Sequence, residues 1–246
     1  MRQSPLFSNI QTGEAYYDDV DRASYKGICL KTFILLALAV LVAGFTAFYL
    51  PTIIATDNYI PFYIALGVSS IVGFISVMVG RMSERAAKYA SVIYSACEGL
   101  FLGNLTCICE AYFPGVATIA VFSTLVIFAI MLTLFATGIL RVTDKFRKFC
   151  FAFTLGALAL TLITTIVFAI GGISTDMLGV LIILELFLLI YGIITLGLNF
   201  AEAQNVVQCG ASKNAEWSVA LGLMVSIVYI YVEILRLAIL ILGRRD

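Results

Sequence analysis

The chain has 246 residues, of which 62% are hydrophobic and 12% are charged, and its formal net charge is zero. A soluble domain carries about 25% charged residues, so much of this apolar surface must contact lipid rather than water. The neutral balance gives no reason to expect nucleic-acid binding. The absence of histidine removes the commonest metal ligand and the commonest general base. The composition therefore predicts an integral membrane protein.

Residues 1–31 are expected to form a cytoplasmic tail, either extended or loosely helical. They are polar and carry charges of both signs. They also lack the short apolar core that a cleavable signal peptide needs. The spans are expected in the domain that follows, residues 32–243.

Seven apolar runs are each long enough to cross a bilayer, which takes about 20 residues in a helix. The expected spans are 32–54, 60–79, 89–108, 116–140, 149–170, 177–200 and 219–242. Because the connections are short, neighbours in sequence are expected to be antiparallel neighbours in space. The predicted fold is an all-α integral membrane protein, a bundle of seven transmembrane helices.

Lysine and arginine occur in alternate loops, which predicts the orientation of the bundle. The tail and the loops after the second, fourth and sixth spans hold these residues, whereas the loops around Asp57, Pro114 and Asp176 hold none. This pattern places the amino terminus in the cytoplasm and, after seven spans, the carboxyl terminus outside. Arg244 and Arg245 oppose the rule, so either the charges of the other loops determine the orientation or the last span does not fully cross the membrane.

Small residues in the third span predict how it packs. Gly99 and Gly103 form a GxxxG motif, which lets two helix backbones approach closely. This motif is common in membrane helices and indicates packing rather than activity. The six cysteines include no CxxC pair, and we interpret them as small buried hydrophobic residues.

Ionisable residues inside spans are the candidate functional residues, because a charge at mid-bilayer costs at least about 2.5–3.5 kcal/mol. The residues that stand out are Glu98, Glu185, Glu233 and Arg236, with Asn199 and Glu202 near the cytoplasmic end of the sixth span. Asn199 and Glu202 are three residues apart and therefore share a helix face.

Each of these candidates also has a structural interpretation. Glu233 and Arg236 could form an ion pair that only makes the helix insertable, or Glu233 could face a polar path. Glu98 could make an interhelical hydrogen bond instead of serving the function. Glu185 is expected to interact near the outer surface or with a neighbouring helix, and Glu202 could simply cap the cytoplasmic end.

The sequence disfavours enzymatic chemistry, and no catalytic residue and no cofactor are predicted. A Ser-His protease needs histidine. An aspartyl protease needs two intramembrane aspartates, and retinal needs a lysine inside a late span. The sequence supplies none of these residues and has no phosphate-binding glycine loop. Carboxylates are, however, the hard oxygen ligands that calcium prefers.

Several stretches resemble motifs of the Bax inhibitor-1 family, in particular its bacterial branch. They are CEGLFLGNLTCICEAYFPG at 97–115, ATGILRVTDKFRKF at 136–149, GASKNAEWSVALGLMVSIVYIYVEILRL at 210–237 and SPLFSN near the start. The matches occur in order and cover essentially the whole chain. The resemblance implies a seven-helix bundle with the last helix at its centre, in a bacterial plasma (inner) membrane.

The resemblance also implies a calcium leak that is pH-sensitive and governed by one acid on span six and one on span seven. Glu233 is similar to the span-seven acid, whereas the span-six acid falls at Asn199. An amide can coordinate an ion through its carbonyl but cannot titrate. Glu202, one turn further on, could substitute for it. Glu233 and Asn199 are thus the candidate calcium ligands, and the pH dependence is expected to be weaker or shifted.

The expected function is membrane ion permeation, by a calcium leak channel or transporter gated by buried carboxylates. Arg81 or Arg85 could form a latch to these acids, although ordinary positive-inside charge also explains both. The alternative function is a non-conducting regulator or scaffold that binds a membrane protease or another membrane complex. The expected partners are the lipid bilayer, calcium ions and a membrane protein, and the chain is expected to be a monomer.

Overall fold

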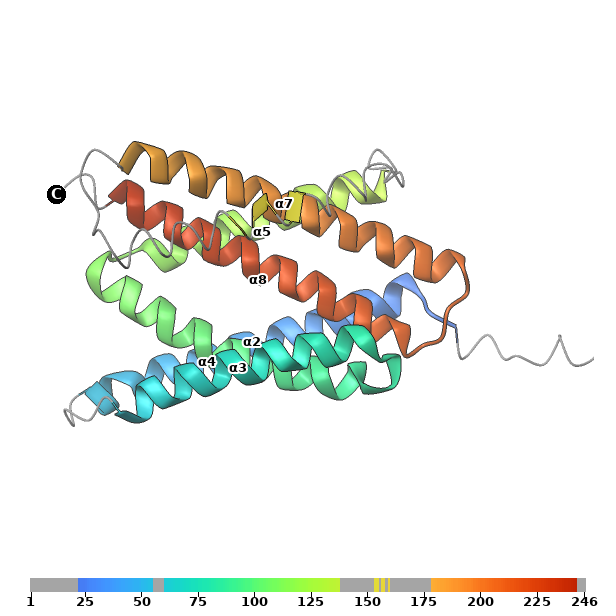
Figure 1. Ribbon diagram of the computed structural model, residues 1–246, viewed down its shortest axis with the longest axis horizontal. Helices are drawn as coiled ribbons and strands as arrows, with labels where there is room; N and C mark the ends of the chain where they lie inside the picture. Colours follow the sequence, from blue (N-terminus) through green and yellow to red (C-terminus); the bar gives the residue numbers. More distant parts are fainter. Residues whose placement is uncertain are drawn as a thin grey trace, which may run out of the picture.

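The computed structural model describes residues 22–54, 60–137, 153–154, 156–157, 159 and 178–242. In these ranges it contains six helices that are long and apolar enough to cross a membrane. They are α2 (Tyr25–Ile54), α3 (Ile60–Met82), α4 (Glu84–Tyr112), α5 (Val116–Ala136), α7 (Leu178–Gln208) and α8 (Ala215–Leu242) (Figure 1). An all-helical membrane protein is thus confirmed, but the described residues show six such helices and not the seven that were predicted. Most of the predicted span 149–170 lies outside the described residues.

Four of the helices extend beyond the predicted spans by one turn or more. α2 begins at Tyr25 rather than at Thr32, so the last residues of the predicted tail belong to this helix. α4 and α8 also begin earlier than predicted, and α7 continues to Gln208. An apolar run marks only the hydrocarbon depth of the membrane, whereas these polar turns are held by contacts beyond it.

The last helix lies at the centre of the described bundle. α8 packs against α2, α3, α4, α5 and α7, and in Figure 1 it runs between α7 and the group formed by α2, α3 and α4. Its Leu221 and Met224 are fully buried. With 28 residues it is about 42 Å long, which exceeds the roughly 30 Å of a hydrocarbon core. Arg244 and Arg245 lie outside the described residues.

The two glycines of the third predicted span bring α4 against α2. A Cβ atom at Gly99 would lie 2.5 Å from the carbonyl oxygen of Ala39, and one at Gly103 would lie 2.7 Å from that of Ala43. Both distances are shorter than a real Cβ contact, so only glycine permits this approach. The close packing predicted from the GxxxG motif is confirmed.

Positive charges collect at one end of the bundle. The start of α2, the α3–α4 turn and the α7–α8 turn all lie there, on the right in Figure 1. The Lys and Arg residues in these segments are Arg22, Lys26, Lys31, Arg81, Arg85, Lys88 and Lys213. We call this end the basic end.

Candidate functional site

A group of buried acids lies between α7 and α8, away from the basic end. Glu233 of α8 is 3% exposed. Nη1 of Arg236 lies 3.7 Å from Oε1 of Glu233 and 3.7 Å from Oε1 of Glu185, which α7 supplies. Tyr229, one turn before Glu233, also interacts with the Glu233 carboxyl group. We call Glu185, Tyr229, Glu233 and Arg236 the Glu233 cluster.

The Glu233 cluster is not balanced in charge or in hydrogen bonding. Two carboxylates share one guanidinium, so with both acids ionised the cluster carries one negative charge in excess. The second oxygens, Oε2 of Glu185 and Oε2 of Glu233, are buried and have no hydrogen-bond partner among the described residues. An unpartnered buried charge is costly in a low dielectric. Uptake of one proton or one cation therefore balances the excess negative charge of the cluster.

A second group of polar residues closes the basic end. Arg81, near the end of α3, donates from Nη1 and Nη2 to the two carboxylate oxygens of Glu202 on α7, at 3.1 and 3.0 Å. Nη1 also donates to the carbonyl oxygen of Ser218 on α8, at 3.4 Å. Such a two-pronged pair fixes geometry as well as charge. Arg81 thereby ties α3 to both α7 and α8.

Asn199 belongs to the same group, one turn deeper on α7. Its Nδ2 donates to the carbonyl oxygen of Gly222 at 2.9 Å and to Oγ of Ser226 at 2.6 Å. A Cβ at position 222 would lie 2.8 Å from Oδ1 of Asn199 and 3.0 Å from Nη1 of Arg81, so a larger residue there would displace these side chains. We call Arg81, Asn199, Glu202, Ser218, Gly222 and Ser226 the Arg81 cluster.

The structure does not bring Asn199 and Glu233 together as the sequence comparison suggested. Asn199 contacts Ser226, which precedes Glu233 by seven residues, or about 10 Å along the helix axis. The carboxylate that shares a cation with Glu233 is instead Glu185. Since α7 and α8 run antiparallel, an acid earlier on α7 meets a residue later on α8. In this conformation Asn199 and Glu233 therefore contact different partners, and their role as calcium ligands stays a prediction.

The two clusters are joined by one polar face of α8. Successive members of this face are three or four residues apart, which places them on the same side of a helix. They are Ser218, Gly222, Ser226, Tyr229, Glu233 and Arg236. Together they span 18 residues, or about 27 Å, which is close to the thickness of a hydrocarbon core.

The opposing side of this face comes from α7, where four members are three or four residues apart and Glu185 lies six residues before the first of them. Its members are Glu185, Tyr191, Thr195, Asn199 and Glu202. The rings of Tyr191 and Tyr229 meet edge to face at 5.7 Å, and Gly192 lets Tyr229 approach the α7 backbone. We call these two facing rows the polar seam. Sequence reasoning found its ionisable members but missed the seam, although the three- and four-residue spacing along α8 was visible.

The remaining predicted residues lie outside the seam contacts. Glu98 on α4 is half-buried and lies beside Tyr94, one turn earlier on the same helix. Arg85 is exposed, and no ion pair joins it to any other described residue. Of the two arginines considered as latches, it is Arg81 that contacts an acid.

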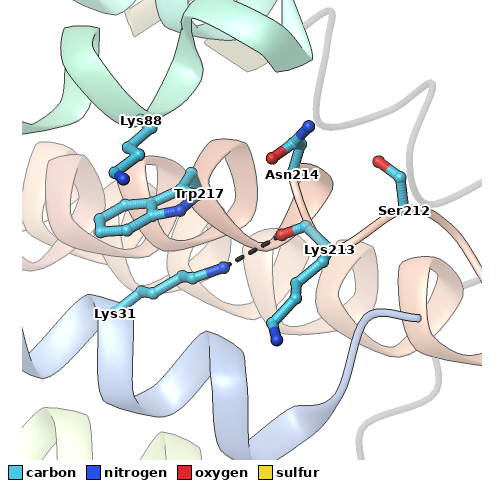
Figure 2. Close-up of a pocket in the computed structure, with 6 residues that line it drawn as sticks. All are labelled: Lys31, Lys88, Ser212, Lys213, Asn214 and Trp217. Carbon is cyan, nitrogen blue, oxygen red and sulfur yellow. Dashed lines mark hydrogen bonds between the residues drawn. The ribbon is translucent and has the colours of Figure 1, made fainter. Parts of the chain in front are cut away.

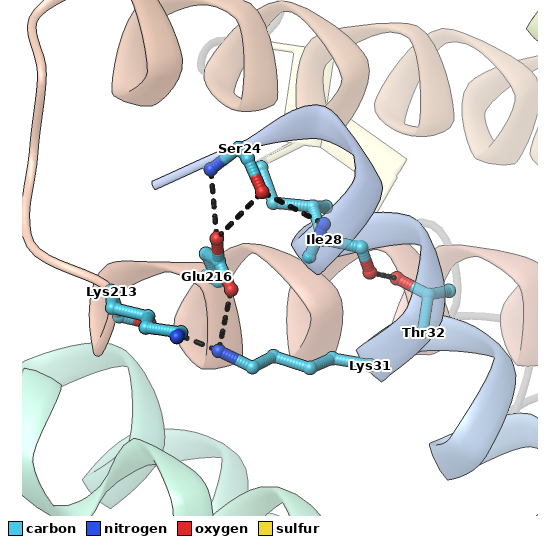
Figure 3. Close-up of polar contacts among 7 residues, drawn as sticks. Ser24, Ile28, Lys31, Thr32, Lys213 and Glu216 are labelled. Atoms are coloured by element: carbon cyan, nitrogen blue, oxygen red, sulfur yellow. Dashed lines mark hydrogen bonds and ion pairs between the residues drawn. The ribbon is translucent and has the colours of Figure 1, made fainter. Parts of the chain in front are cut away.

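A further ion pair, at the basic end, was missed by the sequence analysis. Glu216 on α8 is 1% exposed, and its carboxylate accepts hydrogen bonds from the backbone N–H of Ser24 at 2.7 Å and from Nζ of Lys31 at 2.6 Å. Figure 3 shows Lys31 of α2 and Ser24, which directly precedes α2, both pointing toward Glu216. The Glu216 carboxylate also occupies the space that a Cβ at Gly27 would need. We call Ser24, Gly27, Lys31 and Glu216 the α2–α8 clasp.

Within the described residues, no three His, Cys, Asp or Glu side chains are grouped as a ready-made metal site. What the arrangement can do is hold a proton or a single cation between two acids, and carbonyl and hydroxyl oxygens along the seam can act as further ligands to a cation.

Comparison with known proteins identified one match. A family model described as Bax inhibitor 1 like matches residues 4–242, nearly the whole chain. No curated protein and no solved structure matched the chain.

Proposed function

We propose that this chain, which belongs to the Bax inhibitor 1 like family, is a membrane ion-permeation protein and conducts calcium as a leak channel or transporter. The observation that carries the proposal is the polar seam between α7 and α8, which contains an under-neutralised pair of buried acids, Glu185 and Glu233. Ionisable residues inside a bilayer are costly, and those that face a bundle interior typically mark ion pathways.

The seam has the features of a closed path. Its acids supply the negative charge that attracts a cation, and its hydroxyl, amide and carbonyl groups supply oxygen ligands. At the basic end the path is closed by the Arg81–Glu202 pair, which binds three helices together. Opening of the path then requires Arg81 and Glu202 to separate, so this ion pair acts as the latch.

The proposal includes a dependence on pH that arises from carboxylates, since the chain has no histidine. In the Glu233 cluster the groups that face Glu233 are Glu185, Tyr229 and Arg236, and a proton there competes with a cation for the same excess charge. Asn199 takes no part in titration.

The topology proposed is the seven-helix one, with the amino terminus in the cytoplasm of a bacterial cell and the carboxyl terminus outside. α5 ends at the basic end, where Phe135 contacts Tyr25, whereas α7 begins at the opposite end. One more crossing, at 149–170, fits this arrangement. The positive-inside rule then makes the basic end cytoplasmic. The function proposed needs no enzymatic activity and no cofactor.

The test is calcium flux into dye-loaded liposomes that contain the purified chain. Glu233→Gln and Glu185→Gln each remove one charge from the cluster and are expected to reduce flux. The matched control is Glu84→Gln, because Glu84 is an exposed acid outside the seam. If both seam variants conduct as the wild type does, the path does not run through the Glu233 cluster.

The second candidate function is a regulator or scaffold that binds another membrane protein and conducts nothing. The exposed apolar side chains of the outer helices allow helix–helix contacts of this kind, although lipid covers them equally well. The same liposomes separate the two functions, because a scaffold gives no flux above protein-free vesicles.

A further inference from the structure

The Arg81 cluster closes only the basic end of the polar seam. The neighbouring α7–α8 turn is held to α2 there, because Nζ of Lys31 donates to the carbonyl oxygen of Lys213 at 3.0 Å (Figure 2). The deepest member of the Arg81 cluster on α8 is Ser226, which precedes Glu233 by seven residues, or about 10 Å along the helix axis. The side chains that lie in this stretch determine whether the two clusters are connected.

Two tyrosine rings lie between the two clusters. Tyr229 of α8 and Tyr191 of α7 meet edge to face, with ring centres 5.7 Å apart and an angle of 88° between the ring planes. This is contact distance for an aromatic pair, so no ion passes between the rings as they stand. A Cβ at Gly192 would lie 2.8 Å from Cδ1 of Tyr229, so the Tyr229 ring rests directly on the α7 backbone.

The polar groups of this stretch are engaged away from the ring contact. The hydroxyl group of Tyr191 donates to Oγ1 of Thr154 at 3.2 Å, and Tyr229 interacts with the carboxyl group of Glu233. The hydroxyl group of Thr195, one turn further along α7, donates to the carbonyl oxygen of Tyr191 on its own helix at 2.9 Å. A cation that moves along the seam therefore meets ring carbon atoms here, whereas oxygen atoms are its preferred ligands.

The two rings are held by different neighbours. Tyr191 packs against Phe153 with ring centres 5.8 Å apart, and Phe153 packs in turn against Phe187 at 4.7 Å. Tyr229 is joined instead to Glu233, one turn later on α8. A cation that binds at Glu233 therefore acts first on Tyr229, while Tyr191 stays in place.

We propose that Tyr229 is a second gate of the polar seam, whose ring separates the Glu233 cluster from the Arg81 cluster in the closed state. The inference rests on the proposed function, because a gate needs a path. It adds a barrier in series with the Arg81–Glu202 pair. Opening moves the Tyr229 ring away from Tyr191, and the α7 backbone at Gly192 prevents movement in the direction of α7.

The first test measures access to the seam and does not depend on conduction. Ser226 is 2% exposed, so a cysteine introduced by Ser226→Cys reacts slowly with a charged, water-soluble thiosulfonate reagent while both gates are closed. The full-length protein is held in lipid nanodiscs, and mass spectrometry separates labelling at position 226 from labelling of the native cysteines. Tyr229→Ala, Tyr229→Phe and Tyr191→Ala are each added to Ser226→Cys. The matched control is Tyr231→Ala, because Tyr231 lies on another face of α8 and contacts Thr106 of α4 at 2.8 Å.

Tyr229→Ala is expected to raise the labelling rate by at least about twofold, because the lost ring contact stabilises the closed state by at least that ratio. Tyr191→Ala should do the same, and it tests the same contact if Tyr229→Ala fails to fold. Tyr229→Phe keeps the ring and should label as slowly as Ser226→Cys alone. Unchanged labelling in both alanine variants overturns the gate. An equal rise with Tyr231→Ala overturns it as well, since this would report only a loosened bundle.

The second test is calcium flux into liposomes for Tyr229→Ala, Arg81→Gln and the two changes combined. Two independent barriers in series predict that the increases multiply. A combined variant that conducts no faster than Arg81→Gln overturns the second gate. Absence of flux in the wild type and in every variant would contradict the proposed function, whereas the labelling rates would still decide whether Tyr229 separates the two clusters. Circular dichroism and gel filtration check that the variants keep the wild-type fold.

Discussion

The Arg81–Glu202 pair offers a quantitative test of gating. Its side chains are 37% and 40% exposed, so the pair is partly solvated. Exposed pairs of this kind contribute about 0.2–1 kcal/mol, and the two-pronged geometry favours the upper part of that range. If the pair exists only in the closed state, its loss raises the ratio of open to closed protein by about 1.4- to 5-fold.

The assay is liposome calcium flux for Arg81→Gln, Glu202→Gln and the double variant. Each single change is expected to raise flux by up to about fivefold. The double variant should match the singles rather than multiply them, because both remove the same interaction. The control is Arg85→Gln, an exposed arginine at the same end with no ion pair to a described residue. Multiplying effects in the double variant, or unchanged flux in both singles, would refute the reasoning.

Three further predictions concern packing and burial, each checked by thermal unfolding of the purified protein in detergent. Gly99→Ala should lower the free energy of unfolding by about 1–3 kcal/mol, because the new Cβ meets the Ala39 carbonyl. The control is Gly44→Ala, whose Cβ has nothing within 4 Å and should not destabilise the protein in this way. Lys31→Met should lower the free energy of unfolding by about 3–5 kcal/mol, because it leaves the buried Glu216 carboxylate without its cation. Lys26→Met, at an exposed lysine, should leave the free energy of unfolding nearly unchanged. Asn199→Asp should destabilise by about 1–3 kcal/mol, since a carboxylate cannot donate to the Gly222 carbonyl; equal stability of Asn199→Asp and wild type would contradict that hydrogen bond.

The sequence predicted those parts of the fold that depend on solvent alone. Apolar runs indicated where the chain crosses the membrane, because lipid demands them whatever the packing. The GxxxG motif indicated the α2–α4 contact, since a close backbone approach leaves few alternatives to glycine. Hydropathy did not show where α2 begins, because its first turns are held by Glu216, which is 192 residues away from Ser24.

Two contacts of the candidate site were considered from the sequence, Glu233 with Arg236 and Arg81 with an acid, whereas the contact of Glu185 with Arg236 was not. Glu233, Arg236 and Asn199 stood out because polar groups in a span are expensive, and each lies on the polar seam. Which residue of α8 meets a given residue of α7 depends on how far the two helices are shifted along their axes. A sequence pattern does not determine this shift. Asn199 and Glu233 were grouped as candidate calcium ligands, whereas in the structure Asn199 contacts Gly222 and Ser226.

The most direct measurement of the central proposal is calcium entry into liposomes that contain the wild-type chain, compared with protein-free vesicles and with Glu233→Gln. The account predicts entry above the protein-free level that falls when Glu233 is neutralised. Entry no faster than in protein-free vesicles would contradict it and favour the scaffold.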